Sequence, residues 1–211
     1  MDVQMLTVGP VQENCFLVSE GDRAVIVDPG EEAPRLLRAI ESRGLTLDAI
    51  LLTHTHFDHV GAVAPLAKAT GAPVWCPEIE VPVLQDIMAF VPWPGFGPFE
   101  SWDPEHTVSG GETLKLAGMT FDVRFTPGHS PGHVTYAARG ENALFSGDVL
   151  FEGSVGRVDL PGGDWPTLLA SIAALIDEFD DDATVYPGHM GITTLGVERA
   201  SNPFLRELSQ R

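Results

Sequence analysis

A short apolar strand that runs straight into a cluster of metal-binding side chains constrains this chain more than any other segment. The apolar run at residues 48–52 predicts a buried strand. Four metal-competent side chains follow it within six positions: His54, His56, Asp58 and His59. The apolar stripe of residues 60–67, closed by Gly71, predicts a helix after the cluster. The four side chains are therefore expected on a strand-to-helix loop.

The spacing within this loop suits two metal centres. His54 and His56 are two apart in extended chain, so both imidazoles point the same way and can reach one cation. Asp58 and His59 follow where the chain turns, and they can face a second centre beside the first. The alternative interpretation is a solvated polar loop whose Asp caps the helix.

Three further candidate ligands each follow another predicted strand. They are His129 in residues 126–130, Asp148 in residues 146–148 and His189 in residues 186–190. Loops at one edge of a sheet framework can converge in space although they are distant in sequence. One ion would take His54, His56 and His129, the other Asp58, His59 and His189, with Asp148 as the bridge. Imidazole and carboxylate groups suit Zn, Fe or Mn.

The complete ligand pattern closely resembles the metallo-beta-lactamase superfamily, and within it the short glyoxalase II-like hydrolases. Residues 9–15, 156–164 and 198–204 extend the resemblance over nearly the whole chain. It implies an α/β fold, the four-layer αβ/βα sandwich, with two divalent metals where the two sheets meet. Zinc is the expected metal, with Fe or Mn as alternatives. A hydroxide that bridges the metals would attack the carbonyl of a thioester such as a hydroxyacylglutathione.

Several residues are expected to orient water, support the ligand loop or bind substrate. Asp58, besides binding metal, is the candidate for orienting the attacking water and handling its proton. The resemblance implies that Asp28 holds the ligand loop through hydrogen bonds, although an Asp-Pro-Gly turn is an equal alternative. Arg157, Arg199 and Asn202 are expected near the substrate, while each arginine could instead form a structural salt bridge. His133 and His106 are not expected to bind metal.

Length and composition fit one compact enzyme domain spanning residues 1–211. The chain is 44% hydrophobic, and no linker or repeat divides it. It is too short to contain the C-terminal helical domain that supplies glutathione-binding basic residues in full-length glyoxalase II. A net charge of -18 argues against nucleic-acid partners. No apolar run is long enough to span a membrane, no secretion signal is evident, and the two isolated cysteines predict buried thiols, so a cytoplasmic protein is expected. The resemblance implies a small acyl-thiol substrate.

The remaining pattern alternates between strands and helices. Strands are expected at residues 3–8, 15–19, 24–28, 113–116, 120–125, 134–138 and 143–145. Helices are expected from residue 33 to 40, ended by Gly44, and across residues 168–176. Sheets flanked by helices follow from this order. The aromatic segment 88–102 is expected to form a pocket wall, a lid or a subunit contact, with a packed surface loop as the alternative.

Four functions are compatible with these residues. The first is a thioester hydrolase acting on an S-acyl thiol. The second is an iron-dependent persulfide dioxygenase, whose family shares much of the signature. The third is a lactonase or beta-lactamase, in which the same attack opens a cyclic acyl substrate. The fourth is a non-catalytic metal-binding module, which the complete ligand set disfavours.

Overall fold

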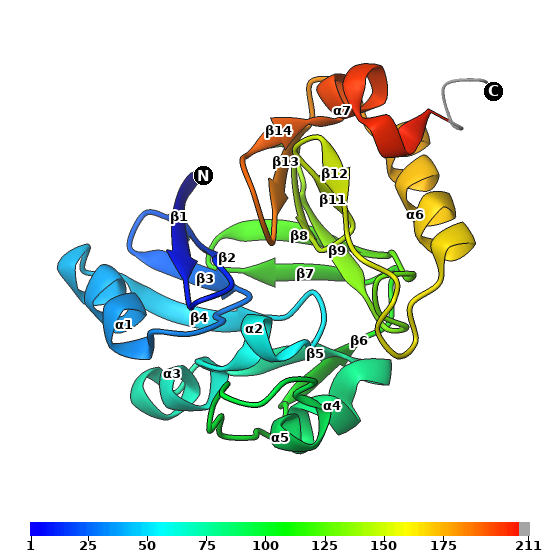
Figure 1. The fold of residues 1–211 in the computed structure, drawn as a ribbon. Coiled ribbons are helices and arrows are strands. Elements are labelled where there is room, and N and C mark those ends of the chain that lie inside the picture. The colour runs from blue at the N-terminus through cyan, green and yellow to red at the C-terminus, as the bar shows by residue number, and fades with distance from the viewer. Residues whose placement is uncertain (207–211) are drawn as a thin grey trace.

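Two mixed sheets lie face to face between outer layers of helices in the computed structural model, which describes residues 1–206 (Figure 1). The first sheet has the order β1-β2-β3-β4-β5-β6 and the second the order β14-β13-β10-β9-β8-β7. A small ribbon of β11 and β12 lies beside the second sheet. The expected four-layer α/β sandwich is confirmed. Within residues 1–206, no helix has both the length and the apolar character needed to cross a bilayer.

The first sheet is built from the N-terminal half of the chain. Its strands are β1 (Asp2–Val8), β2 (Glu13–Glu20), β3 (Arg23–Val27), β4 (Thr46–Leu51), β5 (Val74–Pro77) and β6 (His106–Val108). Neighbouring strands are antiparallel from β1 to β3 and parallel from β3 to β6. The accompanying helices are α1 (Ala33–Ser42), α2 (Phe57–Val60), α3 (Val63–Thr70), η1 (Glu78–Glu80), α4 (Val81–Gln85) and α5 (Ile87–Phe90).

The second sheet follows in the chain. Its strands are β7 (Thr113–Leu116), β8 (Met119–Phe125), β9 (Val134–Ala138), β10 (Ala143–Gly147), β13 (Thr184–Pro187) and β14 (Thr193–Thr194), and the ribbon is β11 (Leu150–Phe151) with β12 (Ser154–Val155). The helices are α6 (Trp165–Glu178), α7 (Leu195–Ser201) and η2 (Pro203–Leu205). β10 and β13 are parallel, and the other pairs are antiparallel.

Side-chain alternation along the central strands creates three apolar layers. In β2, Phe16 and Val18 point into the core between the sheets, while Cys15 and Leu17 point outward beneath α1 and α3. A third apolar layer lies between the second sheet and α6. Because the central strands are covered on both faces, they read as nearly continuous apolar runs. Removing a large central side chain such as Phe145 is expected to cost about 3–5 kcal/mol.

The region predicted as one helix after the His54 loop is two short helices. α2 ends at Val60 and α3 begins at Val63. A side chain on Gly61 would collide with the backbone oxygen of Gly30, because its Cβ would lie 2.4 Å away. Because Gly61, between the two helices, has no side chain, the loop after β3 that contains Gly30 can lie directly against the chain there. The predicted end at Gly71 is confirmed, with a left-handed φ of 73°.

Strand direction gathers the loops that follow the strands at one edge of the sandwich. β3 and β4 are parallel, so Asp28 and His54 follow strands that end at the same edge. In the second sheet, β10 and β13 are parallel, and two successive antiparallel pairings give β8 the same direction as β10. The loops carrying His129, Asp148 and His189 therefore leave the second sheet at one edge. This edge is where the candidate site forms.

Candidate metal centre

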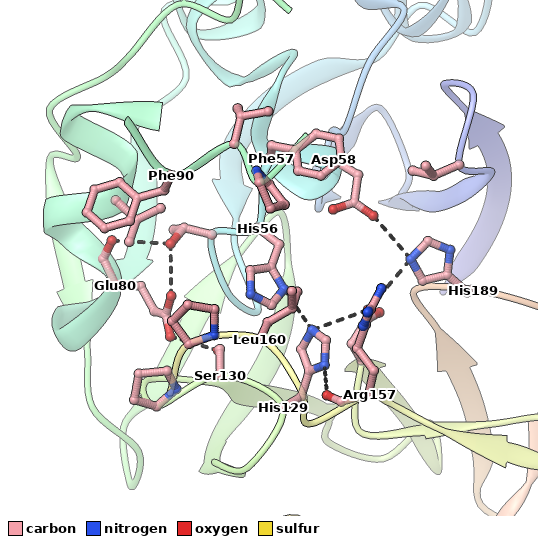
Figure 2. A pocket seen from close by; sticks show the side chains of 18 of the residues that line it. His56, Phe57, Asp58, Glu80, Phe90, His129, Ser130, Arg157, Leu160 and His189 are labelled. Carbon is pink, nitrogen blue, oxygen red and sulfur yellow. Dashed lines mark hydrogen bonds and ion pairs between the residues drawn. The ribbon is translucent and has the colours of Figure 1, made fainter. Parts of the chain in front are cut away.

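The side chains predicted as metal ligands meet at this edge, and they come from both sheets (Figure 2). His56 Nδ1 of the first sheet's loop lies 2.8 Å from His129 Nε2 of the second. His189 Nε2 lies 3.3 Å from Asp58 Oδ2, and His59 Nε2 lies 3.4 Å from Asp148 Oδ1. The sequence-distant groups are thus close neighbours in space.

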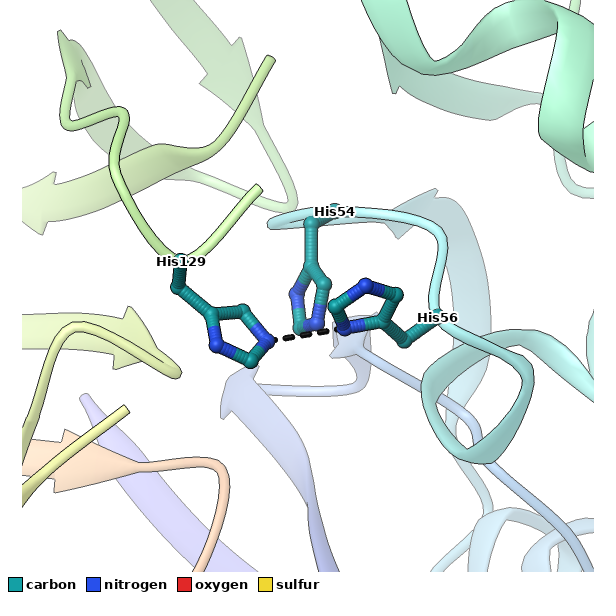
Figure 3. A group of neighbouring side chains, drawn as sticks. All are labelled: His54, His56 and His129. Carbon is teal, nitrogen blue, oxygen red and sulfur yellow. Dashed lines mark hydrogen bonds between the residues drawn. The ribbon is translucent and has the colours of Figure 1, made fainter. Parts of the chain in front are cut away.

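The first group consists of three imidazoles, His54, His56 and His129, that face a common point (Figure 3). Their ligand nitrogens all lie within 4.8 Å of one another. Burial lowers the pKa of His54 well below its usual value and lowers that of His56 to about 4, with the neighbouring imidazoles adding to both effects. Burial also lowers the pKa of His129. At neutral pH these rings are uncharged and can offer lone pairs to a cation.

The second group combines Asp58, His59 and His189, again with ligand atoms within 4.8 Å of one another. Burial opposes a charge on His59, yet Asp148 and Asp58 raise its pKa well above the usual value. His189 shows the same balance. Burial acts to lower its pKa, but Asp148 and the hydrogen bond to Asp58 outweigh this effect, so the pKa lies above its usual value. In this group carboxylates lie close to imidazoles and favour their charged form.

Asp148 lies between the two groups. Its Oδ2 is 3.5 Å from His129 Nε2 of the first group and 3.6 Å from His189 Nε2 of the second. Burial acts to raise the pKa of Asp148, but His59 and His189 more than compensate and hold it below the usual value. An ionised carboxylate in this position can contact cations in both groups.

Three buried polar atoms at the centre have no hydrogen-bond partner among the described residues: His54 Nε2, His59 Nε2 and Asp148 Oδ1. Buried polar atoms are nearly always hydrogen-bonded, so three without such a partner gathered at one centre fit the binding of a cation there. The set of nitrogen and oxygen donors suits Zn, Fe or Mn. The residues present therefore fit two divalent ions.

In three of the candidate ligands a contact made by Nδ1 holds the imidazole so that Nε2 faces the centre. His129 Nδ1 donates to the backbone oxygen of Arg157 at 2.8 Å, and His189 Nδ1 donates to the backbone oxygen of Gln12 at 3.3 Å. His54 Nδ1 contacts Thr53 Oγ1 at 3.0 Å. In each case Nε2 is left facing the centre, as expected for rings held as ligands.

Asp28 supports the ligand loop. Its Oδ1 accepts a hydrogen bond from the backbone N–H of Thr53 at 2.7 Å, and its Oδ2 accepts one from Thr53 Oγ1 at 2.6 Å. Asp28, His54 and His59 also form a third group of neighbouring donors. Because Thr53 already occupies the Asp28 carboxylate, we assign Asp28 to orientation of the loop and leave it out of the ligand set.

His133 is the buried neighbour of the ligands that the sequence did not assign. Its Nε2 accepts a hydrogen bond from the backbone N–H of Asp148 at 3.1 Å, and its ring stacks on His54 with centroids 4.9 Å apart. It thereby fixes the Asp148 backbone without facing the centre. His106 is exposed and stacks on Trp75, far along the sheet at β6.

Glu80 is a site residue that sequence reasoning missed. Its Oε2 accepts a hydrogen bond from Thr55 Oγ1 at 2.8 Å, while its Oε1 accepts from Ser130 Oγ and from the Gly132 N–H, each at 2.7 Å. One buried carboxylate thus joins the loop of His54 and His56 to the loop of His129 (Figure 2). Its partners are 25 to 52 positions away, so no local pattern could indicate the role.

Glu13, at the start of β2, was also missed. It is fully buried, both its carboxyl oxygens are without hydrogen-bond partners among the described residues, and Oε1 lies 3.8 Å from His59 Nδ1. Burial raises the pKa of Glu13 well above its usual value, and Asp28 and Asp58 add to the shift. Burial thus favours the protonated form of Glu13, while the neighbouring His59 acts in the opposite direction. Its place in the segment at residues 9–15 was the only sequence signal.

The centre opens into a cavity of about 720 Å³. His56, Asp58, His129, Asp148 and His189 line one part of it. Apolar side chains from the α4–α5 region and from residues 151–161 line much of the rest. The dimensions are those of a small-molecule site.

Of the three residues expected to contact substrate, only Arg157 lines the cavity. The structure differs from expectation for Arg199, whose guanidinium donates to the backbone oxygen of Ile176 at 2.7 Å and pairs with Asp181 at 3.0 Å. It also differs for Asn202, which is buried and donates to the backbone oxygen of Ser154 at 2.9 Å. Both residues belong to the α7 end of the chain, where they brace helices and the β11–β12 ribbon.

Arg157 lines the cavity but is already paired. Its Nε and Nη2 contact the Asp159 carboxylate at 2.6 and 2.7 Å, and its guanidinium lies 5.5 Å from the centre of the Trp93 ring. The alternative of a structural salt bridge therefore describes Arg157 in this structure. The pKa of Asp159 falls to about 2 because of the same hydrogen bonds.

Comparison with known proteins identifies the class. The chain belongs to the metallo-beta-lactamase superfamily, whose family model matches residues 8–189. It is 37% identical over 212 residues to the hydroxyacylglutathione hydrolase GloC of Haemophilus influenzae, an alignment that covers 99% of this chain and 100% of the relative. This similarity supports the expected glyoxalase II-like membership.

Two solved structures show the same architecture. The BLEG-1 B3 metallo-beta-lactamase is 40% identical with a TM-score of 0.92, covering 97% of this chain and 100% of that one. The protein TTHA1623, solved in a di-iron-bound form, is 44% identical with a TM-score of 0.86, covering 96% of this chain and 100% of that one. The predicted superfamily is confirmed, and the chain is a metallo-hydrolase with His and Asp clusters suited to metal.

Proposed function

We propose that this protein is a dinuclear-metal hydrolase that cleaves thioesters, with hydroxyacylglutathione-like compounds as the reference substrates. The observation that carries the proposal is the pair of ligand groups joined by Asp148 at the inner end of a cavity. The similarity to a hydroxyacylglutathione hydrolase supports a thioester substrate. Zinc is the metal we favour, and the relative in a di-iron-bound form makes iron the alternative.

The residues divide into two holding sets. His54, His56 and His129 would hold one cation, Asp58, His59 and His189 the other, and Asp148 would contact both. When bound, two divalent ions would lower the pKa of a water molecule toward neutrality and polarise the substrate carbonyl. Hydrogen bonds from His129, His189 and His59 to the Arg157 and Gln12 backbone oxygens and the Asp28 carboxylate keep the imidazoles aimed at the centre.

Asp58 is placed to act on the attacking water. Burial would raise its pKa, but His59 and the hydrogen bond from His189 lower it, so the carboxylate is ionised at neutral pH. Because it also lines the cavity, it can accept a hydrogen bond from a water beside the substrate and orient its oxygen toward the carbonyl carbon. The two cysteines are buried in the apolar layers and take no part.

A cyclic acyl substrate is the second candidate. The 40% identity and close superposition with a B3 metallo-beta-lactamase favour it specifically. The same residues would then open a lactam or lactone ring in place of a thioester. The two functions share the attack and differ in the group that leaves.

A substrate panel on metal-assayed protein tests the proposal. We expect S-lactoylglutathione or a simpler thioester to be cleaved at least tenfold faster than a lactone or a beta-lactam, without oxygen uptake on a persulfide. The variant His56→Ala should lose this activity together with bound metal, whereas the control His106→Ala should retain both. Preferred cleavage of the beta-lactam or lactone, or oxygen consumption with the persulfide, would overturn the thioester assignment.

A further inference from the structure

The outer part of the cavity is an apolar channel. Ile87, Phe90 and Trp93 come from α5 and the segment after it, and Leu160 comes from the segment after β12. Phe151 lies deeper, with its ring 5.8 Å from that of His189. Figure 2 shows Phe90 and Leu160 among the side chains around the hollow that leads to His56 and His129. The channel is continuous with the candidate metal centre because both belong to one cavity. A substrate bound in this cavity can therefore contact these side chains while its carbonyl lies at the centre.

The apolar side chains at the mouth are exposed. Phe90 is 55% exposed and Trp93 41%, although both line the cavity. Exposed large apolar side chains gathered around a concave site mark a binding surface. The exposed Phe125, in contrast, lies on β8 and does not line the cavity.

The aromatic wall, formed by Phe90, Trp93 and Phe96, packs against α2, the helix that carries Asp58 and His59. Phe57, at the start of α2, packs against Phe96 with ring centroids 4.8 Å apart and against Trp93 at 6.2 Å. Asp58 and His59 follow Phe57 directly in the same helix. The wall is thus held at a fixed place relative to the reacting centre, as a specificity pocket requires.

The cavity offers little to a negatively charged substrate. Within residues 1–206, Arg157 is the one lysine or arginine that lines it, and its guanidinium is bonded to Asp159. The acidic residues along the wall are Asp58, Glu80 and Asp148. The two carboxylates of a glutathione moiety would therefore meet no unpaired cationic side chain in this part of the chain.

We propose that the cavity selects thioesters by an apolar acyl group of several carbons, and that the glutathione carboxylates contribute little to recognition. This inference rests on the proposed hydrolase function and names its substrate class. In the reaction a water oxygen bonds to the acyl carbon and the C–S bond breaks. One water proton goes to the departing sulfur, so the products are a carboxylic acid, ionised at neutral pH, and a free thiol.

The test uses thioesters of a neutral thiol, N-acetylcysteamine, with acetyl, butyryl, hexanoyl and octanoyl groups, and S-lactoylglutathione beside them. On metal-loaded parent protein we expect kcat/KM to rise by about fourfold for each methylene that the channel buries. The hexanoyl or octanoyl compound should exceed S-lactoylglutathione. A flat dependence on chain length with good turnover would overturn this inference and leave the proposed function standing.

Failure of the function itself gives a different result. If the metal-loaded protein cleaves none of these thioesters, S-lactoylglutathione included, the proposed function and this inference both fail. A binding measurement separates recognition from chemistry. The non-hydrolysable thioether S-octyl-N-acetylcysteamine should shift the tryptophan emission to shorter wavelength in the parent, because it covers the exposed Trp93, and should do so much less in Trp93→Phe. Absence of saturable binding would overturn the assignment of the channel.

Paired variants locate the effect. Phe90→Ala should weaken thioether binding and lower kcat/KM for the octanoyl compound by about tenfold, since it removes a ring from the channel. The loss on the acetyl compound should be much smaller. Phe125→Ala removes an equally exposed ring outside the cavity and should leave both values unchanged. If Phe90→Ala instead separates an oligomer and leaves the chain-length dependence intact, the wall is a subunit contact and the inference fails.

Discussion

Asp28 Oδ2 lies 3.1 Å from His59 Nδ1, on the edge of the imidazole opposite the nitrogen that approaches Asp148. The same carboxylate binds the Thr53 backbone and hydroxyl, so one residue ties β3 to the ligand loop. Asp28 also has a left-handed φ of 47°. Of the two alternatives drawn from the sequence, the contacts of Asp28 favour a support for the ligand loop, and residues 28–30 form no regular turn.

Replacing Asp28 with Asn should weaken metal binding in the group of Asp58, His59 and His189. The amide cannot accept hydrogen bonds on both of its ends, so either the loop or the imidazole loses its partner. We expect a loss of about 10- to 100-fold in metal affinity, measured by competition with a chromogenic chelator. Asp22→Asn, an exposed control, should bind metal like the parent. Equal affinity in Asp28→Asn and parent would refute this role.

Asp58→Ala should damage turnover far more than substrate binding. The variant loses a group that orients water and handles its proton, a contribution of about 10²- to 10⁴-fold in rate. We expect kcat to fall by that order while KM changes much less, in steady-state assays on samples of known metal content. Comparison at matched metal occupancy removes the effect of lost ligation. Parent-like kcat in fully loaded Asp58→Ala would exclude the proposed role.

Glu80→Ala should destabilise the fold as well as the site. The change leaves the Thr55 and Ser130 hydroxyls and the Gly132 N–H without their buried acceptor. We expect a loss of about 2–3 kcal/mol in the free energy of unfolding by urea. Glu78→Ala, an exposed neighbour in the same 3-10 helix, should change it by less than about 0.5 kcal/mol. Similar losses in both variants would contradict the role given to Glu80.

Removing the metal should lower thermal stability. The metal-free centre leaves His54 Nε2, His59 Nε2 and Asp148 Oδ1 buried without partners. Bound ions stabilise the folded state by about 4 kcal/mol when present at a thousand times their dissociation constant. We expect Tm to fall on dialysis against a chelator and to recover when zinc or iron is restored, as followed by circular dichroism. An unchanged Tm in protein proven free of metal would argue against a bound ion at this centre.

Asp122 should stabilise the fold at neutral pH and lose this effect in acid. Hydrogen bonds from Arg139 and Thr113 lower the pKa of Asp122 below its usual value. The contribution is therefore fully present above about pH 5 and is lost as pH falls through the lowered folded pKa. Asp122→Asn should reduce the free energy of unfolding by under about 1 kcal/mol at pH 7, and the difference from parent should shrink below about pH 4. The control Asp180→Asn should show no such trend, and a difference that grows in acid would reverse the argument.

The sequence predicted elements where periodicity was strong and missed those where it was weak. The spacing of Ala33, Leu36 and Ile40 matches the buried face of α1. The short strands β5 and β6, at four and three residues, carry too few positions for an alternating pattern and were not predicted. Two-residue β14 was missed for the same reason, and the adjoining seven-residue α7 was missed because only Leu195 and Glu198 in it are buried, too few for an apolar stripe.

The candidate ligands stand out in the sequence because their chemistry is unusual, whereas the residues that support them do not. His54, His129 and His189 each stand in a short polar motif after a strand, which local reading can detect. Glu80 and Glu13 act only through residues brought close by folding, so they look like ordinary acidic residues in the sequence. Arg157 and Arg199 show the reverse problem, because charge and position suggested substrate contacts while the fold gives each an acidic partner.

The division of the candidate ligands between the two sheets affects how the centre is assembled. During synthesis the ribosome releases His54, His56, Asp58 and His59 long before it releases His129, Asp148 and His189. A cation captured by the nascent chain would have only part of its cage and would exchange freely. If the centre binds metal, tight binding requires the second sheet to be docked on the first, and we therefore expect metal uptake to follow folding of the whole domain.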